Sequence, residues 1–393
     1  MDSKRWRPSW PLRKAVVAIT VLVAIAVVVA VAFSILSTIG RRTILSKVPD
    51  NRNDCDFPAI FNFGDSNSDT GGLSAAFNRL PFPYGETFFH KPSGRFSDGK
   101  VIVDFIAEKL GLPFVSAYLD SIGTNFRHGA NFATGGSTIE EVDGNIFGAG
   151  FSPISLKIQL SQFKQFKART EELFNEGSHT ATNLPRPEDF SKALYTLDIG
   201  QNDLHYVLKF MTEEQLKASI SNIISVFVQA MKDLYQLGAR AFWIHNTGPV
   251  GCLPYSVVYF PQKIDQNGCV KAYNEVAMEF NKQLSDSISE LRIQLSNAVL
   301  TYVDIYSAKY SLISEAKKHG FVDPFGYCYG EKTRGNASES SGAACSDPSV
   351  YISWDGVHYT HAANKWVASQ ILDGSLSDPP IPITQACLKH VLS

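Results

Sequence analysis

The sequence predicts an α/β domain around a central parallel sheet, preceded by one N-terminal transmembrane helix. Short apolar runs of strand length alternate with longer amphipathic runs along the 393 residues, and this order is typical of β-α units. The short runs are nearly continuous in apolar residues, which indicates strands that are buried on both faces. No linker rich in Pro, Gly and Ser divides residues 54–390, so we expect one large domain there.

The expected elements follow from these runs in chain order. Strands are expected at Ala59–Phe63, near Phe132, and at Ala193–Ile199, Ala241–Thr247 and Val299–Asp304. Helices are expected at Val101–Leu110, Leu156–Phe174, Glu213–Leu237, Val270–Leu295 and Thr360–Leu372. We expect residues 40–53 to form a tether before the domain, and Ser375–Pro382 to form a tail loop.

The N-terminal segment, residues 15–39, has the composition of a transmembrane signal-anchor. Of these 25 residues 21 are apolar, and a helix of this length spans the hydrocarbon core of a bilayer. Residues 1–14 carry a net charge of +4, and an excess of Lys and Arg favours the cytosolic side of a membrane. We therefore expect a single-pass type II protein with a lumenal domain. A cleaved signal peptide is the alternative, because Ala30–Ala32 has the A-x-A pattern of a cleavage site.

The part of the chain that follows this segment is acidic. Residues 1–14 carry +4 and residues 15–49 carry +3, which leaves −9 on residues 50–393 for a total of −2. Binding to nucleic acid requires a basic patch or stripe facing the phosphates, and no long basic run occurs in this part. We therefore expect no nucleic-acid partner.

All six cysteines lie in the acidic part of the chain. An even number of cysteines in a domain delivered to an oxidising compartment favours disulfide bonds, and six cysteines allow 15 pairings. Proximity favours Cys252–Cys269 and Cys328–Cys345, which leaves Cys55–Cys387 to join the two ends of the domain. None has the C-x-x-C spacing of a zinc site. Asn336 begins an N-x-S sequon between two of these cysteines and is a candidate glycosylation site.

A polar loop with several glycines follows the first expected strand. Residues Gly64–Gly72 leave the carboxyl end of that strand, where α/β proteins place their sites. Ser66 is therefore a candidate nucleophile, and Gly64 permits a tight turn before it. The alternative is a structural role, because Ser, Asp and Asn are preferred N-caps of helices and Gly is common in loops.

An acid and a histidine lie three residues apart near the C-terminus. The spacing of Asp355 and His358 lets the carboxylate reach the imidazole Nδ1–H, so that Nε2 can accept a proton from a serine. Two alternatives remain: a structural role for His358, or a metal site made of Asp355, His358 and His361. The chain contains no G-x-S-x-G, so it lacks the nucleophile elbow of the α/β-hydrolases.

Two further polar loops, Gly129–Thr138 and Asp198–Asp203, each lie beside an expected strand. Acyl transfer requires donors for the developing oxyanion, and glycine N–H groups or a side-chain amide can supply them. Either loop alone is also consistent with a simple turn. Together the four blocks follow the order Ser, Gly, Asn, Asp-x-x-His.

This order of blocks resembles the plant-type GDSL lipase/esterase family of the SGNH hydrolase superfamily, over nearly all of residues 55–390. The resemblance implies a three-layer α/β/α sandwich and a serine esterase that needs no metal or cofactor. It implies that Ser66 is the nucleophile and that Asp355 and His358 are the acid and base. It also implies that the oxyanion hole consists of Ser66 N–H, Gly136 N–H and the Asn202 side chain.

Two details bear on this resemblance. Asn67 stands where the family name has leucine, which leaves the serine in place. Gly135 and Gly136 are adjacent, so either glycine can be the oxyanion donor. The stretch from Pro83 to Gly99 also resembles plant members of the family.

The substrate is less closely determined than the reaction. The resemblance extends to plant enzymes that act on acetyl or other short acyl esters, and a lumenal anchor in the Golgi would place the domain beside acetylated xylan. We therefore expect an acetylesterase acting on a cell-wall polysaccharide, with secretion to the cell wall as the alternative location. Hydrolysis or acyl transfer of lipid or other carboxylic esters is the second interpretation. A non-catalytic carbohydrate-binding protein is the third.

Overall fold

The computed structural model describes residues 54–141, 151–210, 213–260, 263–330 and 344–388. The chain divides into two units, Met1–Arg52 and Asn53–Ser393, and all described residues belong to the second. Within the described residues no helix is both long and apolar enough to cross a membrane. The expected signal-anchor at residues 15–39, the tether and the sequon at Asn336 lie outside the described residues.

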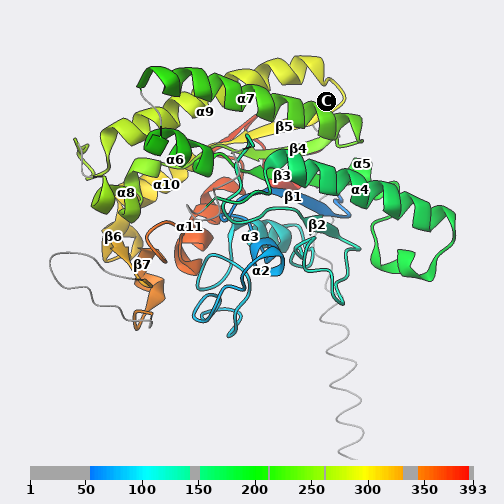
Figure 1. The fold of residues 1–393 in the computed structure, drawn as a ribbon, viewed down its shortest axis with the longest axis horizontal. Helices are drawn as coiled ribbons and strands as arrows, with labels where there is room; N and C mark the ends of the chain where they lie inside the picture. The colour runs from blue at the N-terminus through cyan, green and yellow to red at the C-terminus, as the bar shows by residue number, and fades with distance from the viewer. Residues whose placement is uncertain (1–53, 142–150, 211–212, 261–262, 331–343, 389–393) are drawn as a thin grey trace, which may run out of the picture. The chain divides into compact units, whose positions relative to one another are not determined.

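A six-stranded sheet forms the centre of this unit (Figure 1). Its strands lie in the order β2 (Gly129–Asn131), β1 (Ile60–Gly64), β3 (Leu194–Asp198), β4 (Ala241–His245), β5 (Val299–Val303) and β8 (Ser377–Asp378). The pairs from β2 to β5 are parallel, as the sequence predicts. A second, two-stranded sheet pairs β6 (Asp323–Tyr327) with β7 (Tyr351–Ser353).

The central sheet is mostly parallel, and one edge strand departs from the predicted parallel arrangement. Strand β8 pairs antiparallel to β5, with Ser377 opposite Val303 and Asp378 opposite Tyr302. It lies within Ser375–Pro382, which the sequence predicted to be a loop. The strand has only two residues, and both are polar, so no apolar pattern marks it.

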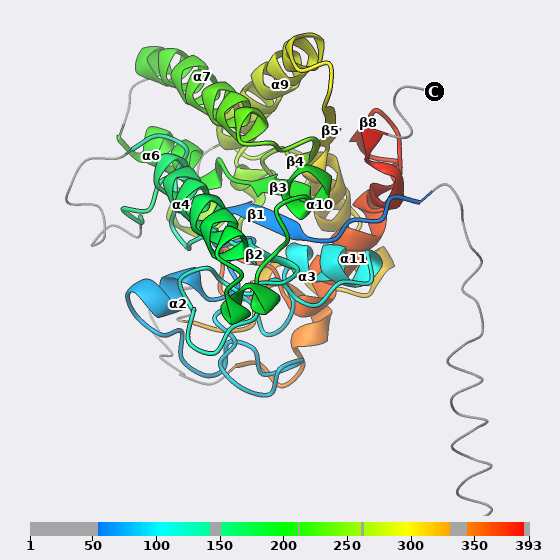
Figure 2. The same cartoon turned by 90° about the vertical axis from the view of Figure 1, so that its right-hand side faces the viewer.

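Helices cover both faces of the large sheet and produce three layers (Figures 1 and 2). Helices α4 (Leu156–Asn175), α7 (Glu213–Gln236) and α9 (Lys271–Gln294) pack on one face, and α3 (Ile102–Lys109), α10 (Ile305–Ser314) and α11 (His361–Ile371) pack on the other. Shorter helices are α2 (Gly72–Ala76), α5 (Asp189–Lys192) and α8 (Pro254–Tyr259), and α6 (Gln201–Phe210) follows β3. All five predicted helices are confirmed, with ends that differ by one residue at most.

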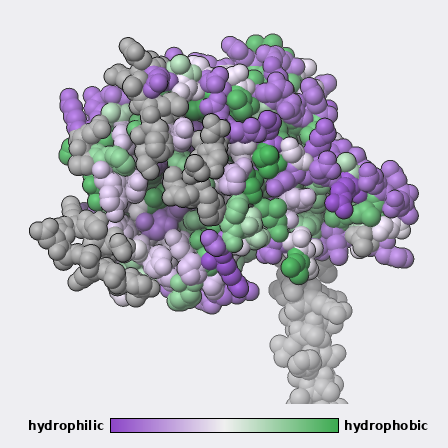
Figure 3. Space-filling model, in the orientation of Figure 1, coloured by the Kyte–Doolittle hydropathy of each residue, from purple (hydrophilic) through white to green (hydrophobic). Residues whose placement is uncertain are grey.

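Alternation of side chains along the strands explains why both faces are covered. Ile60 packs in the core below the sheet with α3 and α11, whereas Phe61 and Phe63 pack in the core above it with α4. The same alternation recurs in β4, where Phe242 and Trp243 belong to opposite cores. Hydrophilic side chains cover most of the outer surface of α7, α9 and α4 on the face drawn in Figure 3, as expected for amphipathic helices.

The six cysteines form three disulfide bonds: Cys55–Cys387, Cys252–Cys269 and Cys328–Cys345. These are the three pairs predicted from the sequence, two by proximity and Cys55–Cys387 as the remaining pair. The first bond joins residues 332 positions apart, and the Cys55 N–H donates to the Thr384 carbonyl oxygen at 2.6 Å beside it. This bond therefore links the segment that precedes β1 to the C-terminal end of the domain.

We predict that replacing Cys55 and Cys387 together with Ala lowers the free energy of unfolding by about 2–5 kcal/mol, because the unfolded chain gains conformational entropy. Denaturant unfolding of the full chain measures the change. The control is the double replacement Cys328→Ala and Cys345→Ala. The bond it removes joins residues only 17 positions apart, so its loss should lower the free energy of unfolding by less. An unchanged unfolding midpoint in the Cys55/Cys387 variant would contradict the prediction.

Candidate active site

Four segments that are far apart in the sequence meet at one edge of the large sheet. Strand β1 lies between β2 and β3 and is parallel to both, so the segments carrying Ser66, Gly136 and Asn202 leave the sheet at the same edge. Residues 354–358 reach this edge after β7. As a result, Ser66, Gly136, Asn202 and His358 line one pocket of about 420 Å³.

Ser66, His358 and Asp355 form a line of hydrogen bonds. The Ser66 Oγ lies 2.8 Å from His358 Nε2, and His358 Nδ1 lies 2.7 Å from Asp355 Oδ2. Ser66 is only 5% exposed, so its hydroxyl faces the pocket and not open solvent. With the proton on Nδ1, His358 presents the lone pair of Nε2 to the serine, which is the arrangement a general base requires.

Each oxygen of the Asp355 carboxylate accepts two hydrogen bonds. Its Oδ1 accepts the backbone N–H groups of Val357 and His358 at 3.0 and 2.8 Å. Its Oδ2 accepts the Tyr84 hydroxyl at 3.0 Å in addition to His358 Nδ1. Burial acts to raise the pKa of Asp355, but the His358 charge and these hydrogen bonds hold it below the ordinary value. The carboxylate therefore stays ionised beside His358.

Tyr84 remains a hydrogen-bond donor in this arrangement. Burial and the adjacent Asp355 carboxylate raise the pKa of Tyr84 well above its ordinary value, so the hydroxyl keeps its proton. The ring makes edge contacts with Trp354, Tyr329 and Phe96 at centroid distances of 5.9, 5.5 and 6.2 Å. This packing fixes the direction of the hydroxyl toward Asp355.

The turn that carries the acid and the histidine is held by its own hydrogen bonds. The Trp354 N–H donates to the His358 carbonyl oxygen at 2.7 Å, and the Gly356 N–H donates to Ser353 Oγ at 2.9 Å. The Phe96 ring lies 4.7 Å from the His358 imidazole, centroid to centroid. These contacts restrict the imidazole to the position that faces Ser66.

Three candidate hydrogen-bond donors belong to residues that line the pocket: the Ser66 N–H, the Gly136 N–H and the Asn202 side-chain amide. The Ser66 and Gly136 N–H groups donate no hydrogen bond to any residue that the structure describes. Asn202, in the first turn of α6, gives one amide hydrogen to the Ser137 carbonyl oxygen at 2.9 Å and retains a second hydrogen. These donors match the requirement of acyl transfer.

The structure distinguishes the two adjacent glycines. The Gly135 N–H donates to Asp69 Oδ2 at 2.8 Å, so it is already used, whereas the Gly136 N–H is available. The buried Asp69 also accepts the N–H groups of Gly71, Gly72 and Leu73. One carboxylate therefore ties the Ser66 loop to the loop that carries Gly136.

Gly64 is required where the chain leaves β1. A Cβ at this position would lie 2.4 Å from Ser68 Oγ and 2.5 Å from the Asp198 carbonyl oxygen, closer than atoms can approach. The Gln159 side chain of α4 bonds both the N–H and the carbonyl oxygen of Gly64, at 3.0 and 2.8 Å. Close packing on β3 and α4 therefore fixes the turn before Ser66.

Buried charges lie behind the candidate nucleophile. Burial and the Asp198 carboxylate raise the pKa of Asp65 to about 7, so Asp65 is largely neutral in mildly acidic solution. For Asp198, burial is outweighed by His245 and by the buried Lys309, which lower its pKa. In mildly acidic solution the negative charge therefore lies on Asp198, close to His245 and Lys309, and less on Asp65.

The walls of the pocket are mostly apolar. Besides the candidate catalytic groups, its lining consists of Leu73, Phe96, Gly135, Phe151, His205, Tyr255 and Val357. An aromatic row leads away from it, because the Tyr255 ring lies 5.4 Å from the His205 ring and 5.0 Å from Tyr259, which is 52% exposed. An ester with an extended alcohol or acyl group can pack along these rings.

The structure brings Ser66, Asp355, His358, Gly136 and Asn202 together, and it separates His361 from them. The His361 Nδ1 accepts the Lys100 N–H at 3.0 Å, and its ring stacks on Phe88 at 5.5 Å. The polar stretch around Asn202 was expected to be a loop, but it begins helix α6. Sequence reasoning missed Tyr84 and Asp69, whose partners are 271 and 66 residues away.

Comparisons with known proteins identify one family of similar sequences. The family model described as GDSL-like Lipase/Acylhydrolase matches residues 60–371, from β1 to the end of α11. Two GDSL esterase/lipases of Arabidopsis thaliana are 53% and 54% identical to the chain. The two alignments cover 86% and 85% of this chain and 91% of each relative. An esterase of Hevea brasiliensis is 50% identical over 85% of this chain and 90% of its own length.

We predict that Tyr84→Phe lowers kcat/KM for p-nitrophenyl acetate roughly tenfold, the size expected for a hydrogen bond to a charged group. The acid limb of the pH–rate profile should also move to higher pH. Without the Tyr84 hydroxyl, Asp355 Oδ2 accepts a hydrogen bond from His358 alone. The carboxylate charge is then less shared, and it stabilises the imidazolium form of His358 more strongly. The profile of kcat/KM against pH measures both effects.

Tyr329→Phe is the matched control for this variant. Tyr329 belongs to the same aromatic cluster, 5.4 Å from the Trp354 ring, but its hydroxyl makes no hydrogen bond to a described residue. It should leave the pH profile in place. Identical profiles for Tyr84→Phe and the unchanged protein would show that Tyr84 does not position Asp355.

Proposed function

The chain belongs to the GDSL-like lipase/acylhydrolase family and is a carboxylic ester hydrolase, and we propose that it removes acetyl groups from a cell-wall polysaccharide such as xylan. The observation that carries the catalytic part of this proposal is the unbroken line from Ser66 Oγ through His358 to Asp355, at 2.8 and 2.7 Å. The identity of the substrate, an acetylated polysaccharide, is the more specific part of the proposal.

The proposed reaction proceeds in two acyl-transfer steps. His358 Nε2 accepts the Ser66 proton as Oγ attacks the ester carbonyl carbon, and the imidazolium that forms lies beside the ionised Asp355. The resulting oxyanion faces the N–H groups of Ser66 and Gly136 and the amide of Asn202. The proton then passes from Nε2 to the departing alcohol oxygen, which leaves an acyl group on Ser66.

Water completes the cycle by the same route. His358 Nε2 accepts a proton from water as the water oxygen attacks the acyl carbon, and the proton returns to Ser66 Oγ as the acid departs. Each step uses only side chains and N–H groups of this chain, so the proposed mechanism needs no metal or cofactor.

Two features support a carbohydrate ester as the substrate. Tyr255 lines the pocket of about 420 Å³, and the exposed Tyr259 ring packs next to it. Aromatic faces of this kind pack well against the apolar faces of sugar rings, while a small acetyl group needs little space beside Ser66. The apolar walls, which include Leu73, Phe151 and Val357, favour a second candidate, hydrolysis of lipid or other longer acyl esters.

We further propose that the domain works in the secretory pathway. Three disulfide bonds join the described cysteines, and such bonds persist in oxidising compartments. A Golgi membrane location with a lumenal domain depends on the expected signal-anchor at residues 15–39. Secretion to the cell wall follows instead if that segment is cleaved.

We predict that Ser66→Ala lowers kcat for p-nitrophenyl acetate roughly 10⁴- to 10⁶-fold. Asn202→Ala, which removes one donor to the oxyanion, should lower kcat by a factor on the order of 10²–10³. Ser161→Ala, at an exposed position of α4, is the control and should have no effect. A correctly folded Ser66→Ala protein with most of the original activity would refute the assignment of the nucleophile.

The substrate is tested by comparing acyl chain lengths and polymers. We predict that the full chain prefers p-nitrophenyl acetate to p-nitrophenyl palmitate, and that it releases acetate from acetylated xylan faster than from acetylated pectin or mannan. Acetate release is measured directly, with the Ser66→Ala variant as the blank. A preference for palmitate would instead support the lipid esterase.

A further inference from the structure

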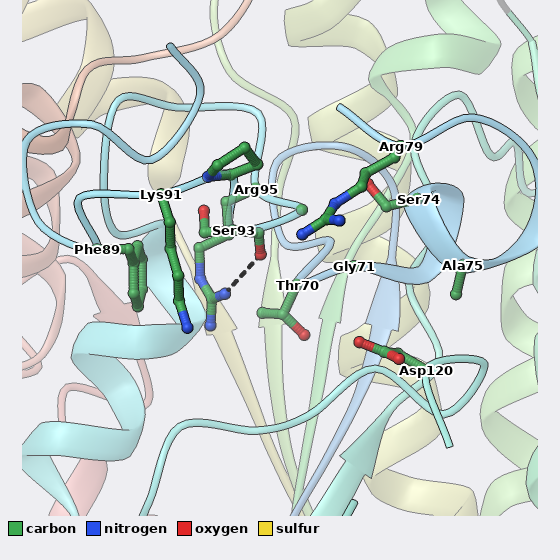
Figure 4. Close-up of a pocket in the computed structure, with 12 residues that line it drawn as sticks. Thr70, Gly71, Ser74, Ala75, Arg79, Phe89, Lys91, Ser93, Arg95 and Asp120 are labelled. Carbon is green, nitrogen blue, oxygen red and sulfur yellow. Dashed lines mark hydrogen bonds between the residues drawn. The ribbon is translucent and has the colours of Figure 1, made fainter. Parts of the chain in front are cut away.

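The structure has a second hollow, of about 570 Å³ (Figure 4). We define the basic hollow by its charged lining residues, Arg79, Lys91, Arg95 and Asp120. Figure 4 shows Lys91 beside the Phe89 ring on one side, Arg79 and Asp120 on the other, and Arg95 between them. The rest of the lining consists of small and hydroxyl-bearing residues from 70–75 and 92–94.

The basic hollow and the catalytic pocket share a wall. Leu73 and Phe96 line the catalytic pocket, whereas their chain neighbours Ser74 and Arg95 line the hollow. The two wall segments are in direct contact, because a Cβ on Gly94 would lie 2.6 Å from the Gly71 Cα. A ligand group in the hollow is thus separated from the ester-binding pocket only by the thickness of this wall.

The charges in the basic hollow are not balanced. Arg95 is held by the buried Asp104, through Nε and Nη2 at 2.7 Å each, and its Nη1 donates to the Ser93 carbonyl oxygen at 3.1 Å. Arg79 and Lys91 are exposed, and neither forms an ion pair with any residue that the structure describes. Of the lining residues that the structure describes, only Asp120 is acidic, so the hollow is positive on a domain whose residues 50–393 carry −9.

This combination of groups fits a sugar carboxylate better than a phosphate. Two free cations suit one negative charge, and the fixed guanidinium of Arg95 lies between them. Asp120 would repel a dianion, but it can accept hydrogen bonds from sugar hydroxyl groups. Ser74 and Ser93 add further polar contacts, and the Phe89 ring offers an apolar face.

We propose that the basic hollow binds the carboxylate of a uronic acid unit on the same carbohydrate chain whose ester enters the catalytic pocket. This inference rests on the proposed function, because it takes the substrate to be a polysaccharide. It adds that the preferred substrate is acidic. The hollow then sets specificity through substrate binding, while the chemical step at Ser66 is unaffected.

The test measures binding without hydrolysis, in the full-length Ser66→Ala protein. Its ligands are a deacetylated oligosaccharide that contains one uronic acid and the same compound with the carboxyl group reduced to an alcohol. We expect roughly tenfold tighter binding of the acidic compound, the effect of one charge-assisted hydrogen bond. The advantage should disappear when Arg79→Gln and Lys91→Gln are added, and it should weaken as salt is raised.

The matched control adds Arg169→Gln and Lys282→Gln, which remove two exposed cations of helices α4 and α9 that do not line the hollow. The control should retain the full preference for the acidic compound. Equal affinity for the acidic and reduced compounds, or an equal loss in the control, would overturn the proposal. Inorganic phosphate that binds as tightly, with the same dependence on Arg79 and Lys91, would also overturn it in favour of a general anion site.

A kinetic experiment separates this proposal from the proposed function. With Ser66 present, Arg79→Gln and Lys91→Gln should raise KM for an acetylated acidic oligosaccharide roughly tenfold and leave kcat and p-nitrophenyl acetate hydrolysis unchanged. An equal KM increase for the matched neutral oligosaccharide would contradict the carboxylate site. If no acetylated oligosaccharide is hydrolysed, the proposed function fails, and the binding experiment still decides whether the hollow recognises a carboxylate.

Discussion

The parallel pairing of β1 with β2 and β3 is the constraint on which the candidate active site depends. Phe61 lies opposite Ala130 on one side and Tyr195 on the other, and this register sets where each loop leaves the sheet. The register is firmly specified because both faces of β1 are buried, and a slip of one residue would exchange its two sets of side chains. The Phe61 ring stacks on Phe190 at 5.1 Å and packs against Phe163 at 5.2 Å, which fixes it further.

The acid and the histidine reach the site through separate contacts. Their turn follows β7, and the Cys328 and Tyr329 N–H groups donate to the Trp354 carbonyl oxygen at 3.0 and 2.7 Å. The Tyr84 hydroxyl also donates to the Asp355 carboxylate, although the two residues are 271 positions apart in the sequence. The site therefore depends on both halves of the domain, and the Cys55–Cys387 bond joins the ends of that same domain.

The sequence predicted the elements that have a strong local pattern. The buried apolar runs of β1, β3, β4 and β5 and the amphipathic helices needed no tertiary information. Helix α6 was missed because its first residues, Gln201 to Asp203, are polar residues that also favour turns. Strand β8 was missed because edge pairing with β5 forms it, and its Ser-Asp sequence carries no apolar alternation.

The sequence by itself determined which chemical groups are present and their order: Ser66, the adjacent glycines, Asn202 and the Asp355–His358 pair. Only the tertiary structure decided how these groups are used. It left the Gly136 N–H available by directing that of Gly135 to Asp69, and it directed His361 to Lys100, away from the acid–base pair. It also placed Tyr84 on Asp355 and gathered Arg79 and Lys91 into one hollow. The physical reason is that each of these outcomes depends on a hydrogen bond or charge contact between distant segments, whereas a local sequence pattern reports only its own neighbours.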